Sequence, residues 1–211
     1  MRYPEHRAAT KALAHEPHVN ELNSYVGELR NRYPERFVPL VSPEFGGVQA
    51  RLMLLTLSPG RQTRDDVAQG SGFLSADNTD VAAERISAAL EFSGIDRRDC
   101  VPWNIYPWYV GNFRSYSGAE QARMLREGAD LLIQVIARLP RLRAVFIFGD
   151  LPRQAWGHFA QQYPRTNRML HRTHHRSTGP AGYIGSREQQ AVWQQQLLDK
   201  MVRAKRSLDQ R

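Results

Sequence analysis

Apolar residues in this chain fall into short, nearly continuous runs and into longer stretches with a spacing of three or four positions. The segment at 51–57 reads Arg-Leu-Met-Leu-Leu-Thr-Leu, a pattern typical of a strand that is covered on both faces. Further short runs predict strands at 100–106, at 143–148 and, just ahead of a group of histidines, at 168–173. Buried strands of this length are typical of an α/β core.

Helical spacing occurs between and around these runs. Apolar residues that recur on one helical face predict an N-terminal helix over 17–31. Asn78 is a good N-cap for a helix that should end near Gly94. The remaining predicted helices cover 120–139, 151–159 and 187 to about 206.

Because strands and helices alternate, the strands should pair in parallel. We therefore expect a three-layer α/β/α fold with a central, mostly parallel four-stranded sheet. No linker, internal repeat or low-complexity tract divides the chain, which favours a single domain over 1–211 with a core at about 50–205. The basic C-terminal end is expected to be frayed and solvated.

The chain is strongly basic, with 29 Lys and Arg residues against 21 Asp and Glu, a formal net charge of +8 and a pI of about 10.0. Such an excess makes polyanions the natural class of partner, although a generically basic protein has the same composition. Charge alone does not choose between these interpretations.

Cys100 is the one cysteine, which excludes an intrachain disulfide and a cysteine-ligated zinc or iron–sulfur site. We expect neither cofactor nor metal; the histidines at 171, 174 and 175 would suggest a metal only with a spaced cysteine or acidic partner. No apolar run reaches membrane-spanning length and the N-terminus lacks a secretory core, so we expect a cytoplasmic protein with no membrane partner.

Four short motifs follow the predicted strands or lie between them. In order along the chain they are Leu57-Ser58-Pro59-Gly60, Gly70-Ser71-Gly72-Phe73, Trp103-Asn104 and His175-Arg176-Ser177. Their order resembles that of the uracil-DNA glycosylase superfamily over about residues 50 to 205, and the segment from Ala144 to Trp156 adds to the likeness. The resemblance implies a monomeric DNA glycosylase without iron–sulfur cysteines, acting in base excision for DNA repair or in defence against phage.

In that family a base is flipped out of the DNA into a pocket and its N-glycosidic bond is hydrolysed. The resemblance implies that Phe73 stacks on the base, that the amide of Asn104 reads its Watson–Crick edge, and that Gly60 lies beside the sugar. His175 would donate a hydrogen bond to a base carbonyl as negative charge develops, with His174 as the competing assignment. Uracil is the default base, and another damaged or modified pyrimidine, including a modified phage base, is the alternative.

The chain departs from the family where water is activated. Ser58 stands where the family has Asp or Asn, and its hydroxyl can orient a water molecule but cannot act as a carboxylate. Asp77 is our candidate for that missing carboxylate. The alternative for Asp77 is a structural role at a helix start, which it would share with Asn78 and Asp80.

Further residues are candidates for the pocket mouth and for DNA contacts. Tyr106 follows Asn104 closely and would line the mouth of the pocket or pack in the core. The predicted DNA-binding residues are Arg61, Arg172, Arg176, Ser177 and Tyr183.

Two other functions fit parts of this pattern. A catalytically inactive nucleic-acid-binding protein would keep the base pocket and lack chemistry at Ser58. An unrelated nucleotide-binding or phosphohydrolase enzyme is disfavoured, because neither a P-loop nor a well-placed Gly-x-Gly-x-x-Gly motif is present.

Overall fold

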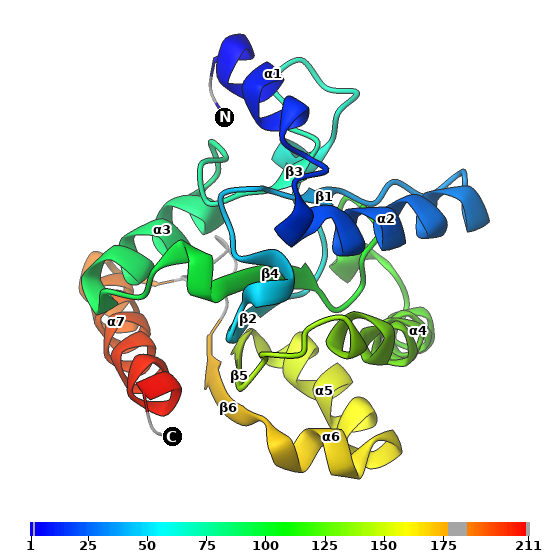
Figure 1. Ribbon diagram of the computed structural model, residues 1–211. Helices are drawn as coiled ribbons and strands as arrows, with labels where there is room; N and C mark the ends of the chain where they lie inside the picture. The colour runs from blue at the N-terminus through cyan, green and yellow to red at the C-terminus, as the bar shows by residue number, and fades with distance from the viewer. Residues whose placement is uncertain (2, 177–184, 210–211) are drawn as a thin grey trace.

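The centre of the computed structural model, which describes residues 1, 3–176 and 185–209, is a parallel four-stranded sheet (Figure 1). Its strands lie in the order β4-β2-β5-β6, and all three pairings are parallel. This confirms the predicted α/β class with a central parallel sheet flanked by helices. The strands are β2 (Leu52–Thr56), β4 (Cys100–Asn104), β5 (Ala144–Phe148) and β6 (His171–His175).

The central strand β2 is buried on both faces, as its continuous apolar sequence predicts. Successive side chains of a strand point to opposite faces. Leu52 and Leu54 accordingly belong to one hydrophobic cluster, and Met53 and Leu55 belong to another. The sheet therefore separates two cores.

Helices cover each core (Figure 1). On one face lie α3 (Val81–Ser93) and α7 (Arg187–Asp209), which pack against each other. On the other face lie α2 (Pro17–Arg32), α4 (Gly118–Ala137) and α5 (Asp150–Gln162). These helices match the predicted ones, with boundaries that differ by a few residues.

Several smaller elements were not predicted from the sequence. Two helices, a two-stranded parallel sheet and four 3-10 turns lie around the core. They are α1 (Pro4–Ala12), α6 (Pro164–Met169), β1 (Leu40–Val41), β3 (Phe73–Leu74), η1 (Gly47–Gln49), η2 (Arg61–Thr63), η3 (Arg97–Asp99) and η4 (Phe113–Ser115).

The N-cap of α3 is Asp80, and the prediction of Asn78 is wrong. The Asp80 carboxylate accepts hydrogen bonds from the backbone N–H groups of Ala82 and Ala83, both at 3.0 Å. The amide of Asn78 instead donates to the carbonyl oxygen of Phe73 at 3.0 Å. The predicted end of the helix is confirmed, because Gly94 adopts the left-handed conformation that a C-terminal glycine favours.

Two boundaries near the C-terminal end also differ from expectation. Residues 164–169 form α6, so the last strand begins at His171 and contains both His174 and His175 instead of ending before them. The last helix, α7, continues to Asp209 with Leu208 buried, and the carbonyl oxygen of Leu208 accepts a hydrogen bond from Arg51 at 3.1 Å. The described part of the C-terminal end is thus anchored to the core.

Helix α4 approaches the end of β4 very closely at Gly128. A Cβ atom at this position would lie 1.9 Å from the carbonyl oxygen of Ile105, which is backbone and cannot move aside freely. Gly27, inside α2, has no atom within 4 Å of the same position. Packing therefore requires a glycine at position 128 but not at position 27.

We predict that Gly128→Ala destabilises the protein by about 1–3 kcal/mol through overpacking. Gly27→Ala should instead raise the free energy of unfolding by about 0.5–1 kcal/mol, because alanine is the better helix former. Urea denaturation of both variants measures this difference. Equal stabilities for the two variants would contradict the close approach of α4 and β4.

Candidate functional site

A cavity of about 640 Å³ opens at the carboxyl ends of β2, β4 and β5. Ligands commonly bind at this edge of an open parallel sheet, in cavities of about 300–1,000 Å³. Four aromatic rings contribute to its wall: Phe45, Trp103, Phe113 and Phe148. The polar side chains in the wall include Thr56, Ser58, Asn78, Asp80, Asn104 and Arg114.

Asn104 presents a buried amide in this wall. Because Thr56 and Asn104 are register partners at the ends of β2 and β4, the amide nitrogen Nδ2 of Asn104 donates to Oγ1 of Thr56 at 2.6 Å. The side chain is 3% exposed, and its oxygen Oδ1 has no hydrogen-bond partner among the described residues. An unsatisfied buried acceptor costs about 1–3 kcal/mol, so a donor that reached this covered oxygen would gain a hydrogen bond that the protein itself does not supply.

The loop after β2 forms a second part of the wall. Leu57, Ser58, Pro59 and Gly60 all line the cavity. The pairing of the two strands continues into this loop, because the N–H of Tyr106 donates to the carbonyl of Leu57 at 2.9 Å. Ser58 and Gly60 therefore lie at the cavity, where the resemblance predicts them.

The segment before α3 forms a third part of the wall. Asn78 is 8% exposed, and its oxygen Oδ1 has no hydrogen-bond partner among the described residues. The N-cap residue Asp80 also lines the cavity. The helix-start pattern revealed both residues in the sequence, but it gave no sign that they face a cavity.

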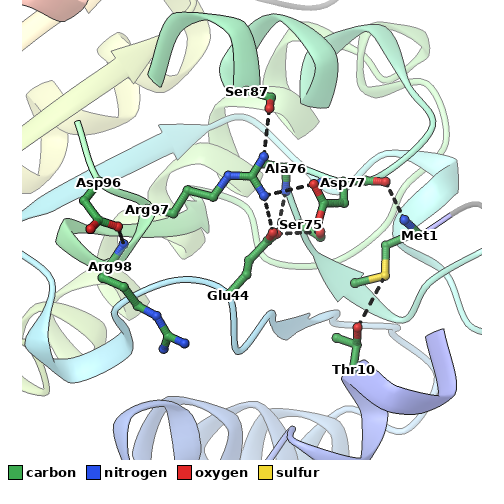
Figure 2. Close-up of polar contacts among 10 residues, drawn as sticks. All are labelled: Met1, Thr10, Glu44, Ser75, Ala76, Asp77, Ser87, Asp96, Arg97 and Arg98. Carbon is green, nitrogen blue, oxygen red and sulfur yellow. Dashed lines mark hydrogen bonds and ion pairs between the residues drawn. The ribbon is translucent and has the colours of Figure 1, made fainter. Parts of the chain in front are cut away.

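Asp77 lies outside the described wall and belongs to a charged cluster (Figure 2). One guanidinium nitrogen of Arg97, Nη1, lies 2.9 Å from Oδ1 of Asp77 and 2.5 Å from Oε2 of Glu44. Arg97 also donates to the hydroxyl of Ser87, and the hydroxyl of Ser75 donates to Glu44. Both parts of the prediction for Asp77 therefore need correction, since it neither reaches the cavity nor caps α3.

The two carboxyl groups of this cluster titrate differently. Burial raises the pKa of Glu44, and the neighbouring Asp77 adds to that rise. Burial also acts to raise the pKa of Asp77, but hydrogen bonds from Glu44 and Arg97 outweigh it and hold that pKa below its ordinary value. The cluster ties the loop before α3 to η3.

Three side chains were expected to surround an extruded base, and of these Asn104 is in the described wall. Phe73 is buried elsewhere, in a small cluster with Met1 and Ala14, because β3 pairs with β1 beneath the N-terminal segment. His175 is also outside the described wall. The expectation that all three converge on one hollow is thus not met by the described residues.

His175 nevertheless lies close to the cavity. It is the register partner of Phe148, which lines the cavity, and neighbouring strands lie about 4.8 Å apart. Burial, together with the positive charge of Lys200, lowers the pKa of His175 to about 4. Its imidazole is therefore neutral at neutral pH.

His174 has a different environment from His175. Its side chain is half-buried, and its Nε2 atom lies 3.6 Å from Oδ1 of Asp150. Burial lowers the pKa of His174 more strongly than Asp150 raises it. His174 is also absent from the described wall of the cavity.

Tyr106 lies in the core and not at the cavity. Its ring contacts those of Trp108 and Phe113 edge-on, at centroid distances of 5.0 and 6.1 Å. This is the core-packing alternative that the sequence left open. Aromatic side chains do reach the cavity, but from Phe45, Trp103, Phe113 and Phe148, of which Trp103 and Phe148 could have been found from their place near the ends of predicted strands.

The predicted DNA-binding arginines are exposed and differ in their contacts. Arg61 is exposed in η2, Arg172 donates to the carbonyl and side-chain oxygens of Asn167, and Arg176 stacks over the ring of Trp193 at 4.2 Å. Ser177 and Tyr183 lie outside the described residues. Arg114, which the sequence did not single out, lines the cavity and is exposed.

Within the described residues, no group of three or more His, Cys, Asp or Glu side chains is arranged to hold a metal ion. None of the described helices combines the length and the apolar character needed to cross a membrane. No protein-family model matches the chain, and no curated protein sequence is significantly similar to it. The family resemblance therefore rests on the motifs and their order.

The low pKa of His175 predicts a stability that depends on pH. An unfolded histidine binds a proton near pH 6.5, whereas His175 in the folded chain binds one at about pH 4. The unfolded state thus holds more protons in this window, and the free energy of unfolding should fall as the pH drops from about 6.5 to about 4.

His175→Gln removes this titration, so its free energy of unfolding should change less than that of the wild type between about pH 7 and about pH 5. Urea denaturation at a series of pH values gives the two slopes. His174→Gln is the matched control and should flatten the slope less. Parallel curves for His175→Gln and the wild type would contradict the assigned burial of His175.

Proposed function

We propose that this protein is a DNA glycosylase that binds a flipped pyrimidine in the cavity and hydrolyses its N-glycosidic bond to leave an abasic site. The observation that carries the proposal is the buried amide of Asn104, a residue that lines a largely apolar cavity and whose Oδ1 atom has no partner among the described residues. The order of the sequence motifs and the position of the cavity at the strand ends also support it.

The amide of Asn104 is suited to reading a pyrimidine edge. Its oxygen can accept a hydrogen bond from the ring N–H of uracil or from an exocyclic amino group. Its nitrogen is held by Thr56, which fixes the orientation of the amide before a base arrives. Asn78 offers a second buried acceptor, so the preferred ligand carries more than one hydrogen-bond donor.

The remaining roles are divided among other residues at the strand ends. A flat base would stack on aromatic rings of the wall, a role that passes from Phe73 to Trp103, Phe113 or Phe148. His175 is fully buried and lies outside the described wall, so its neutral imidazole is not assigned a direct contact with the departing base. Exposed arginines and the net charge of +8 favour phosphate contacts.

A second candidate is a DNA-binding protein that no longer cleaves. The observation in its favour is that Ser58, and not a carboxylate, stands in the loop after β2 at the cavity. Such a protein would bind duplex DNA in a salt-dependent manner and leave no abasic sites. Alkaline cleavage after incubation with the protein separates these two functions.

We predict that Asn104→Ala slows base release by about 10- to 100-fold, which corresponds to the loss of about 1–3 kcal/mol from a buried hydrogen bond. The substrates are labelled duplexes that contain a single deoxyuridine, 5-hydroxymethyldeoxyuridine or 5-hydroxymethyldeoxycytidine. Alkaline cleavage and gel electrophoresis measure the rate. Asn31→Ala, at an exposed asparagine near the end of α2, should match the wild type.

If the wild-type protein leaves abasic sites in none of these duplexes, even in excess over DNA, the glycosylase proposal fails. Salt-dependent binding in the same samples would then favour the second candidate. If Asn104→Ala instead releases base at the wild-type rate, Asn104 does not take part in base recognition.

A matched pair of substitutions tests the positioning role of Thr56. Thr56→Val keeps the shape of the side chain but removes the hydroxyl that orients Asn104, so base release should fall by about 10-fold, equivalent to about 1.4 kcal/mol. Thr56→Ser keeps the hydroxyl and should retain nearly the wild-type rate. Equal rates for the two variants would show that the contact does not orient Asn104.

A further inference from the structure

The proposed hydrolysis needs a group that takes a proton from water, and neither sequence candidate supplies a carboxylate at the cavity. Ser58 is weakly acidic and is not a general base by itself. The carboxylate of Asp77 is held by Arg97 outside the described wall. Among the described lining residues, the remaining carboxylate is that of Asp80.

Asp80 is held in a fixed position by the helix that it caps. Its Oδ1 atom accepts two hydrogen bonds from the first turn of α3, donated by the backbone N–H groups of Ala82 and Ala83 at 3.0 Å each. Its second oxygen, Oδ2, is not used by the cap. A carboxylate fixed by two backbone bonds does not need to reorganise when a reaction begins, which is the property that favours catalysis.

An N-cap alone does not indicate a ligand, but two independent features of the same wall do. The carbonyl oxygens of Asn104 and Asn78 are both more than nine-tenths buried and lack partners among the described residues. Asn78 lies two residues before Asp80 on the same segment, and both line the cavity. The segment before α3 thus shares one cavity wall with the buried amide of Asn104.

We propose that Asp80 is the catalytic carboxylate of this site, an inference that rests on the proposed glycosylase function. Its free oxygen accepts a proton from a water molecule as the water oxygen bonds to C1′ of the deoxyribose. The bond between C1′ and the base nitrogen breaks, and its electron pair moves to the base. Asp80 then gives its proton up to solvent and the base takes one up from solvent, so that the elements of water are divided between the abasic sugar and the released base.

The test separates the charge of Asp80 from its role as a cap. Asparagine and serine are N-caps about as good as aspartate, so Asp80→Asn and Asp80→Ser should fold with thermal midpoints close to that of the wild type. Both lack the carboxylate, and their single-turnover base release should fall by about 100-fold or more. Affinity for the same duplex, measured by fluorescence anisotropy, should change little.

Asp77→Asn is the matched control, because it changes a nearby carboxylate that the described wall does not contain. It loses part of the ion pair with Arg97 and should lower the thermal midpoint while base release per folded molecule stays at the wild-type rate. The two aspartates should therefore show opposite effects on rate and on stability.

The outcomes distinguish this inference from the function on which it rests. If the wild type releases base and Asp80→Asn releases it equally fast, Asp80 is a cap alone and the inference is wrong. A rate loss in Asp77→Asn that equals the loss in Asp80→Asn would also overturn it. If the wild type releases no base from the duplexes named above, the glycosylase function fails and the catalytic role of Asp80 fails with it.

Discussion

Parallel pairing of β2 with β4 and β5 is the constraint on which the other features of this protein depend. Both faces of β2 are buried, and its alternate side chains pack in the two cores. Its register with β4 places Thr56 beside Asn104. The same pairing aligns the carboxyl ends of the strands, where the cavity opens.

Polar groups in this cavity are few, and their orientation is fixed by the fold. Asn104 is held by a strand neighbour, Asn78 by the carbonyl of Phe73, and Asp80 by a helix end. Each contact uses part of a side chain, and the Oδ1 atoms of Asn104 and Asn78 keep no partner among the described residues. Polar atoms in apolar surroundings interact more strongly than they would in water, so a few such groups could be enough to select a ligand.

The sequence predicted the framework well because the framework depends on burial. Apolar runs identified β2, β4 and β5, the fourth strand was predicted a few residues too early, and helical spacing identified the helices on both sides. The sequence also predicted that residues 58–60 and Asn104 lie at the strand ends, because a parallel sheet brings the carboxyl ends of its strands together. The strands and helices follow from periodicity, whereas the choice of these site residues came from the family resemblance together with the topology.

The wrong predictions concern residues whose position depends on small irregular elements. Phe73 was expected at the cavity, but the short pairing of β3 with β1 carries it beneath the N-terminal segment. Asp77 and Asp80 are three positions apart and chemically alike, but Asp77 pairs with Arg97 whereas Asp80 caps α3. Contacts of this kind join segments that are distant in the chain, so no local pattern encodes them.

The position of Asp80 also has a consequence for how a catalytic carboxylate can be supported. A carboxylate in a loop such as the one that holds Ser58 needs additional contacts to fix its direction. At the start of α3, the backbone N–H groups that need an acceptor provide this support, and the cap itself stabilises the helix by about 1 kcal/mol. One set of hydrogen bonds therefore ends the loop, begins the helix and orients the second carboxylate oxygen. A charged group can occupy this place at no cost to the fold, so the presence of Ser58 and not a carboxylate after β2 does not by itself exclude the proposed hydrolysis.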